Sequence, residues 1–214
     1  MSWTLYSAWR ATAPYRLRIG LALKGVTYDY APIDLIAGEQ REPAYRAVNP
    51  QGLTPALDIG DGHVLTQSLA ILEWLEETRP EPAILPKAPL DRAAVRAMAL
   101  IVACDIHPLN NTRVGRELHK RGVDPEGIKA WSQRWIRDGF DTLEPMIARH
   151  GRGFAFGATP TLADCCLIPQ VYSAGRFEVD LDPYPAIRAV AERAAEHPAF
   201  QAAHPNKQPD AKPL

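Results

Sequence analysis

Two predicted helix starts supply groups from which an anion-binding site could be built. The first start follows a short loop, Ala8 to Ala13, which contains Arg10, Ala11 and Thr12. Pro14 then favours a helical first turn, because its missing N–H would have no partner there. The second start lies at Gln67-Ser68, just before an apolar run. Free N–H groups and the positive end of the helix dipole favour an anion at each start, and a carboxylate suits the second. Ser68 also has a plainer interpretation as a helix N-cap, and the two roles are compatible.

A third group is the backbone that enters the short strand predicted at Leu53–Ile59. Thr54 precedes Pro55 near the start of this strand. An exposed strand edge at this point can pair with the backbone of an extended peptide. The alternative is an ordinary trans proline on an edge strand, since only about 5–6 % of bonds that precede proline are cis.

The elements that position these groups form an α/β unit over residues 1–80. The patterns predict strands at 3–7, 26–33, 53–59 and 64–66, helices at 14–24 and 69–77, and a helical turn near Tyr45. The first strand–helix–strand segment implies a parallel pair with a right-handed crossover. The turn Gly60-Asp-Gly-His predicts a hairpin.

The remainder of the chain predicts an all-α domain over residues 91–214. Residues 81–90 are rich in proline and form a predicted linker. Helices are expected at about 91–119, 125–149, 161–174 and 184–204. Thr161 and Asp164 have the spacing of a capping box that opens the third of these helices. The tail from Pro205 is expected to be poorly ordered.

The composition and residue spacing argue against nucleic acid as a partner, a membrane span, a secretory signal and a metal site. Lys+Arg 24 against Asp+Glu 25 gives a formal net charge of -1, so there is no basic excess for nucleic acid. No run approaches the ~18 apolar residues of a membrane span, and no secretory signal pattern opens the chain. The three cysteines have neither disulfide-framework nor zinc-site spacing. The expectation is a protein of the reducing cytoplasm without a metal.

Six segments resemble the cytosolic glutathione S-transferases, and most closely their zeta class, the maleylacetoacetate and maleylpyruvate isomerases. They are Arg16-Leu-Arg-Ile with Ala22-Leu-Lys-Gly, Asn49-Pro-Gln, Gln67-Ser-Leu-Ala-Ile-Leu-Glu-Trp-Leu-Glu-Glu, Cys104-Asp-Ile-His-Pro-Leu-Asn-Asn, Thr161-Leu-Ala-Asp-Cys and Arg176-Phe-Glu-Val-Asp-Leu-Asp-Pro-Tyr-Pro. Their order covers nearly the whole chain. The resemblance implies a thioredoxin-like α/β domain that binds glutathione, followed by an all-helical domain that binds substrate.

The resemblance also implies roles for individual residues. Glutathione would lie against the backbone of Leu53 and Thr54 beside a cis Pro55, with its γ-glutamyl carboxylate at Gln67 and Ser68. The chain would form a homodimer, in which Asp105 and Asn110 approach glutathione held by the partner chain. The segment of His107 would lie beside the active cleft. Carboxylates of a small dicarboxylate substrate need cations, and three candidates follow from the resemblance, Arg10, Arg113 and Arg176. The alternative for these arginines is a solvated helix face.

The implied reaction is glutathione-dependent cis–trans isomerisation of maleylpyruvate or maleylacetoacetate. Where the family has Ser-Ser-Cys or Ser-Gly-Thr, this chain has Ala11-Thr12-Ala13, so only Thr12 keeps a hydroxyl. The glutathione thiolate would be stabilised either by Thr12, or by the helix N-terminus together with Arg10. Two other functions stay open: a general glutathione transferase or peroxidase that acts on electrophiles, and a non-catalytic glutathione-binding protein.

Overall fold

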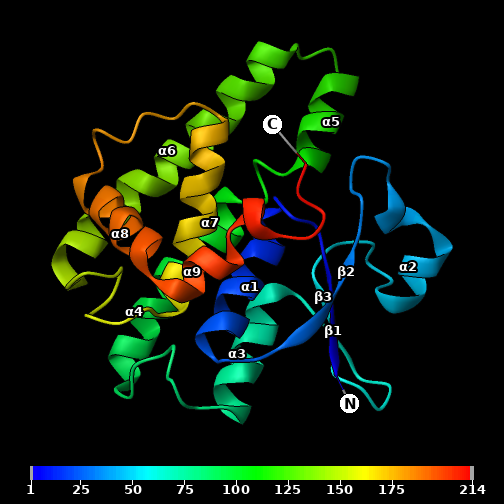
Figure 1. The fold of residues 1–214 in the computed structure, drawn as a ribbon. Coiled ribbons are helices and arrows are strands. Elements are labelled where there is room, and N and C mark those ends of the chain that lie inside the picture. Colours follow the sequence, from blue (N-terminus) through cyan, green and yellow to red (C-terminus); the bar gives the residue numbers. More distant parts are fainter. Residues whose placement is uncertain (1, 213–214) are drawn as a thin grey trace. The chain divides into compact units, whose positions relative to one another are not determined.

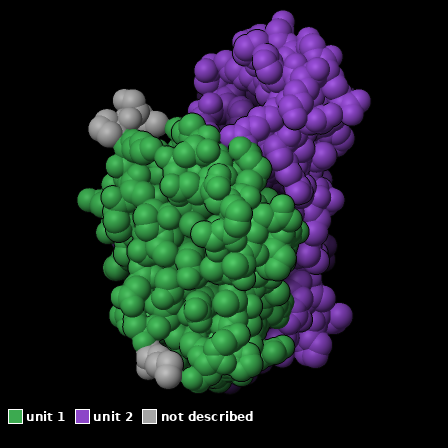
Figure 2. Space-filling model, turned by 90° about the vertical axis from the view of Figure 1, so that its right-hand side faces the viewer, with its two compact units in different colours: residues 1–84, 197–214 green, residues 85–196 purple. Residues whose placement is uncertain are grey.

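The computed structural model describes residues 2–212, which divide into two compact units (Figure 2). The first unit contains residues 2–84 and 197–212, and the second contains residues 85–196. The end of the first stretch at Ile84 lies inside the predicted linker. The assignment of residues 197–212 differs from the predicted division at position 91. The physical reason is that α9 (Pro198–Ala203) packs on α1 (Thr12–Leu23), where the Arg18 Nε atom donates to the Ala203 carbonyl at 3.0 Å.

The first unit is built on a sheet of four strands in the order β2-β1-β3-β4. The strands are β1 (Trp3–Ser7), β2 (Tyr28–Pro32), β3 (Ala56–Asp58) and β4 (Val64–Thr66). The pair β1–β2 is parallel and the other two pairs are antiparallel, which confirms the predicted strand–helix–strand segment and the hairpin. Strand β3 begins later than the predicted Leu53, after Pro55. A proline has no N–H to donate to a strand ladder.

Three helices cover this sheet. They are α1, α2 (Pro43–Val48) and α3 (Ser68–Thr78). In Figure 1, α1 and α3 lie on one side of the sheet and α2 lies on the other. Gly20 lets α1 and α3 approach closely, since a Cβ at this position would lie 2.0 Å from the Leu72 Cδ2 atom. Leu5, Leu57 and Leu72 are fully buried in the core of the unit.

The second unit is helical throughout its regular elements. They are α4 (Pro89–Leu100), a π-helical turn (Ile101–Ile106), α5 (Thr112–Lys120), α6 (Pro125–His150), α7 (Leu162–Arg176) and α8 (Pro185–Glu196). Helices α6 and α7 match their predicted spans to within two residues, and the capping box of Thr161 and Asp164 is confirmed. In the part of the chain that the structure describes, no helix is both long enough and apolar enough to cross a bilayer.

Two segments that were predicted to be single continuous helices are each broken in the structure, so these two predictions are wrong. The segment 91–119 breaks after the π-helical turn, and α5 starts afresh where the Asn111 side chain accepts from the Arg113 N–H at 3.0 Å. The segment 184–204 breaks at His197. Pro198 has no N–H to continue the ladder of α8, and the His197 Nδ1 atom caps α9 by accepting from the Ala199 N–H.

The predicted disorder of the tail is also wrong for residues 205–212. Pro205–Lys207 form a 3₁₀ turn. Beyond it, the Asp210 carboxylate accepts from the Trp9 N–H at 3.0 Å and from the Tyr30 hydroxyl at 2.7 Å. The last two residues of the predicted tail, 213–214, lie outside the described residues.

Candidate functional site

Three of the predicted binding segments lie at one edge of the sheet. The strand register pairs Tyr6 with Ala56, and Ala56 with Thr66. The loop that follows β1, the Thr54-Pro55 turn that precedes β3 and the Gln67-Ser68 pair that follows β4 are therefore adjacent across the sheet. This arrangement places two helix N-termini beside the half-buried backbone of Leu53 and Thr54.

The loop after β1 gives the first of these N-termini. Ala11 is the N-cap of α1 and has no side chain to accept from the first turn. The N–H groups of Thr12 and Ala13 therefore remain available as donors. The Thr12 side chain is largely covered, with the residue only 9 % exposed, while the Arg10 guanidinium stacks over the Trp9 ring at 5.3 Å. Backbone donors and one cation thus dominate this loop.

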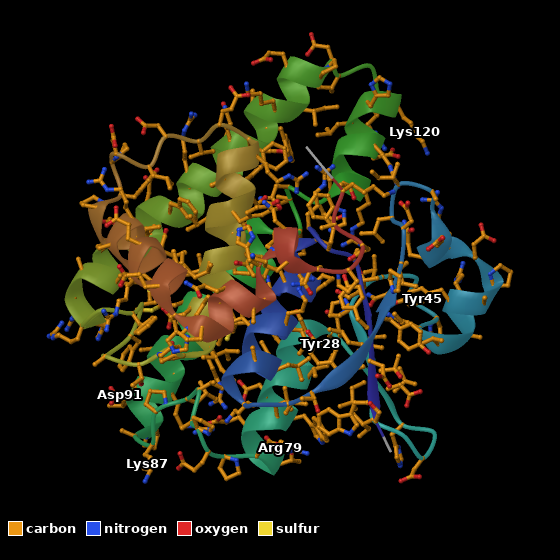
Figure 3. The ribbon with its side chains drawn as sticks, in the orientation of Figure 1. Tyr28, Tyr45, Arg79, Lys87, Asp91 and Lys120 are labelled. Carbon is orange, nitrogen blue, oxygen red and sulfur yellow. The ribbon has the colours of Figure 1, made fainter. Side chains whose placement is uncertain are left out.

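The turn before β3 is held from the side of α2. The Leu53 carbonyl accepts from the Tyr45 hydroxyl at 2.7 Å and from the Asn49 side-chain amide at 2.7 Å. Tyr45 projects from α2 (Figure 3), and burial raises its pKa to about 12, so the hydroxyl stays a donor at neutral pH. The Thr54–Pro55 bond is cis, as predicted. The internal bonds to Leu53 fix the segment and leave the half-buried Thr54 at the sheet edge.

The second helix N-terminus begins at Ser68. Gln67 is the N-cap, with φ +65°, so the interpretation of Ser68 as the cap is wrong. The Gln67 side-chain amide donates to the Gln51 side chain at 2.7 Å. Ser68 is 4 % exposed, and its hydroxyl oxygen accepts from the Arg16 Nη1 atom at 3.0 Å. The backbone donors at the start of α3 therefore have no side-chain cap.

The second unit holds the other five predicted residues. Asp105, His107, Asn110, Arg113 and Arg176 all lie in or beside the segments 101–113 and 162–176. Asp105, Arg113 and Arg176 are exposed, and Asn110 is buried with an Nδ2 atom that has no partner among the described residues.

One turn of α6 anchors both of these segments. The Trp131 Nε1 atom donates to the Leu109 carbonyl at 2.8 Å, and the Gln133 Nε2 atom donates to the Phe177 carbonyl at 2.8 Å. Leu109 lies between His107 and Arg113, and Phe177 follows Arg176 directly. Residues 131–133 of α6 therefore fix the two backbone segments that carry the candidate residues of the second unit.

Comparison with known proteins places this arrangement in a family. The family model for the glutathione S-transferase N-terminal domain matches residues 13–78. A maleylacetoacetate isomerase of Pseudomonas aeruginosa is 50 % identical over 208 residues, which cover 96 % of this chain and 97 % of that protein. The chain belongs to the glutathione S-transferase family.

Solved structures of this family agree over the full length. The holo structure of a maleylpyruvate isomerase, described as a bacterial zeta-class glutathione S-transferase, matches with a TM-score of 0.96 at 51 % identity and covers 98 % of this chain and all of that one. A maleylacetoacetate isomerase of Anaeromyxobacter dehalogenans, with bound dicarboxyethyl glutathione and citrate, matches with a TM-score of 0.90 at 45 % identity, covering 99 % and 94 %. The predicted family, fold and zeta class are confirmed.

This member of the glutathione S-transferase family also fixes its first loop with residues that the sequence analysis missed. Arg18 is fully buried, and its Nη2 atom donates to the Trp9 carbonyl at 2.6 Å. Asp210 accepts from the N–H of the same residue, so both peptide groups of Trp9 are held. Burial lowers the pKa of the Arg18 guanidinium. An arginine within an apolar helical run was a usable signal for Arg18, whereas the tail around Asp210 carries no such pattern.

Proposed function

We propose that this protein is a glutathione-dependent isomerase that converts a maleyl diketo acid, maleylpyruvate or maleylacetoacetate, to its fumaryl form. The observation that carries the proposal is the strand register, in which Tyr6 pairs with Ala56 and Ala56 pairs with Thr66. This register brings the two uncapped helix N-termini and the Thr54-Pro55 turn to one edge of the sheet. An extended anionic tripeptide needs this combination of backbone pairing and anion-binding ends. We assign glutathione binding to the first unit and substrate binding to the second.

The residues of the first unit fit glutathione. Bound glutathione supplies a thiolate, whose addition to the cis double bond and later elimination permit rotation about the carbon–carbon bond. The N–H groups of Thr12 and Ala13, with Arg10, stabilise negative charge at the start of α1. The backbone of Thr54 pairs with the cysteinyl amide, and the start of α3 binds the γ-glutamyl carboxylate. These roles align glutathione along the sheet edge.

The candidate arginines bind the substrate. During the reaction, negative charge develops on a carbonyl oxygen of the diketo acid, and guanidinium groups with backbone donors stabilise it. In the second unit, Arg113 and Arg176 supply planar two-point donors that also suit the substrate carboxylates. The dicarboxyethyl group on the glutathione bound in the related Anaeromyxobacter isomerase carries two carboxylates, which supports a dicarboxylate substrate for this chain.

Turnover of maleylpyruvate and of maleylacetoacetate, with and without glutathione, tests the function. We expect isomerisation only with glutathione, and no decrease in free thiol as product accumulates. Thiol consumption with an electrophile and no isomerisation would identify a transferase. Glutathione affinity without turnover of either acid would identify a binding protein, and both results would overturn the proposal.

The source of thiolate stabilisation is predicted from the covered position of Thr12. We expect Thr12→Val to leave the ultraviolet pH titration of the bound thiol nearly unchanged, because the N–H groups of α1 and Arg10 carry the stabilisation. Arg10→Ala should move the titration midpoint upward by about one pH unit, which corresponds to ~1.4 kcal/mol. An upward movement of this size in Thr12→Val would show that the hydroxyl is the donor instead.

Removal of Arg176 is predicted to weaken substrate binding. Arg176→Ala should raise KM for the dicarboxylate by about tenfold or more, because one charge-assisted contact contributes about 1.5–3 kcal/mol. Glutathione affinity should be unchanged. Arg193→Ala, on the exposed face of α8, is the control for loss of one charge. Substrate kinetics that are equal in the two variants would show that Arg176 does not bind the substrate.

We also propose a homodimer and a cytoplasmic location. The family resemblance implies that Asp105 and Asn110 approach glutathione held by the partner chain, which requires two copies. Light scattering at micromolar concentration should give twice the chain mass, and a monomer mass would contradict this. The cytoplasm is consistent with the three cysteines, Cys104, Cys165 and Cys166, which form no disulfide within the described residues, and cell fractionation tests it.

A further inference from the structure

Arg16 is a buried cation whose hydrogen-bonding capacity is mostly unused. It is 3 % exposed and makes one hydrogen bond, from Nη1 to the Ser68 hydroxyl oxygen at 3.0 Å. Its Nε and Nη2 atoms are buried and have no hydrogen-bond partner within residues 2–212.

The neighbouring buried cations of the first unit are satisfied. Arg18 donates from all three of its nitrogens, to Ala203, Ser7 and Trp9. Lys24 forms an ion pair with Glu76 at 2.6 Å. Arg16 has no ion pair with a carboxylate of the described chain. A buried charge without a counter-charge is unfavourable, and such groups call for an explanation such as a missing anion.

The place of Arg16 indicates where that anion binds. Ser68 is the first residue of α3, and the N-cap Gln67 makes no side-chain cap. A guanidinium group can only donate, so the Ser68 oxygen acts as the acceptor and its own proton remains available. Arg16 therefore turns the Ser68 hydroxyl into a donor at a helix N-terminus, where the backbone N–H groups also lack partners.

We propose that Arg16 is a positioning residue for the γ-glutamyl carboxylate of glutathione, acting through Ser68. It orients the Ser68 hydroxyl toward the carboxylate and provides the buried positive charge behind it. This role rests on the proposed function, because that function supplies the anion. The bound carboxylate in turn gives the buried guanidinium the counter-charge that the described chain does not provide.

Calorimetry with two ligands isolates this role. The first ligand is glutathione, and the second is 4-aminobutyryl-cysteinyl-glycine, which lacks only the γ-glutamyl carboxylate. Arg16→Met should weaken glutathione binding by about tenfold or more, in line with loss of a charge-assisted contact. Binding of the second ligand should change less than about twofold, because the group that Arg16 serves is absent. Arg16→Lys should restore part of the glutathione affinity by restoring charge.

Arg79→Met is the matched control. Arg79 follows the last residue of α3, the end of the helix opposite Ser68 (Figure 3), and stacks over the Trp3 ring. It removes one arginine charge from the same unit and should leave both affinities unchanged. If Arg16→Met does not fold, Ser68→Ala with the same ligand pair carries the test, because it removes the hydroxyl through which Arg16 acts.

The outcomes separate the two proposals. Equal weakening of both ligands in the Arg16 and Ser68 variants would mean a merely structural role and overturn the inference. Unchanged glutathione affinity in those variants would also overturn it. A wild-type protein that binds neither ligand would overturn the proposed function itself, and with it the anion on which the inference depends.

Discussion

Asp164→Ala is expected to lower the free energy of unfolding by about 3–5 kcal/mol. Asp164 is fully buried and accepts from the Ala155 N–H at 2.7 Å, the Thr161 N–H at 2.8 Å and the Thr161 hydroxyl at 2.8 Å. Alanine would leave these buried donors without an acceptor and would remove the capping box of α7. A buried donor that loses its partner costs about 1–3 kcal/mol.

Urea unfolding at pH 8 measures this effect. Burial raises the pKa of Asp164 to about 6 although hydrogen bonds from Ala155, from Thr161 and from its own backbone oppose the change, so pH 8 keeps the carboxylate ionised in both the folded and unfolded chain. Asp180→Ala is the control, since Asp180 makes a similar bond to the Asp182 N–H on the exposed surface. The control should change stability by less than about 0.5 kcal/mol. A loss below about 1 kcal/mol in Asp164→Ala would contradict the assigned role.

Lys24→Met is expected to lower the free energy of unfolding by about 3–5 kcal/mol, because it removes one partner of a buried ion pair. The Lys24 Nζ atom lies 2.6 Å from the Glu76 Oε2 atom and 2.8 Å from the Arg79 carbonyl oxygen, and its side chain is fully buried. Glu76 would remain 7 % exposed without its cation, still accepting from the Ile84 N–H at 3.0 Å.

A double-mutant cycle distinguishes the pair from simple loss of packing. Glu76→Gln keeps an acceptor for the Ile84 N–H and removes the charge. The double variant Lys24→Met/Glu76→Gln should therefore be less destabilised than the sum of the single variants. Lys129→Met is the control, because its pair with Glu178 is exposed and should contribute less than about 1 kcal/mol. Additive effects of the Lys24 and Glu76 substitutions would show that the ion pair is not coupled.

The elements that follow from local chemistry could be predicted. These elements depend on neighbours within a few residues. They are the turn between β3 and β4, the capping pair Thr161 and Asp164, and the positions of Thr54-Pro55 and Gln67-Ser68. The sheet edge that unites the binding segments then follows from strand register. The family resemblance contributed the cis state of Pro55, which local sequence does not specify.

What could not be predicted depends on contacts between distant residues. Arg16 and Ser68 are 52 positions apart, and Asp210 and Trp9 are 201 positions apart. No local pattern marks either partner. The break after the π-helical turn depends in part on Trp131 of α6, whose Nε1 atom donates to the Leu109 carbonyl. Because Trp131 lies outside residues 91–119, the sequence of that segment alone could not predict the break. Arg16 itself was visible as a charge in an apolar helix, but its burial was not.

Because residues 197–212 belong to the first unit, some contacts of that unit can form only late in synthesis of the chain. The second unit is one uninterrupted stretch, so all its residues are synthesised before α9. The sheet is synthesised earlier, but Arg18 can reach the Ala203 carbonyl and Asp210 can bind Trp9 only after residues 197–212 have been made. The first unit therefore gains its last contacts after the second unit has been synthesised. The loop at the start of α1 becomes fully held only once Ala203 and Asp210 are in place.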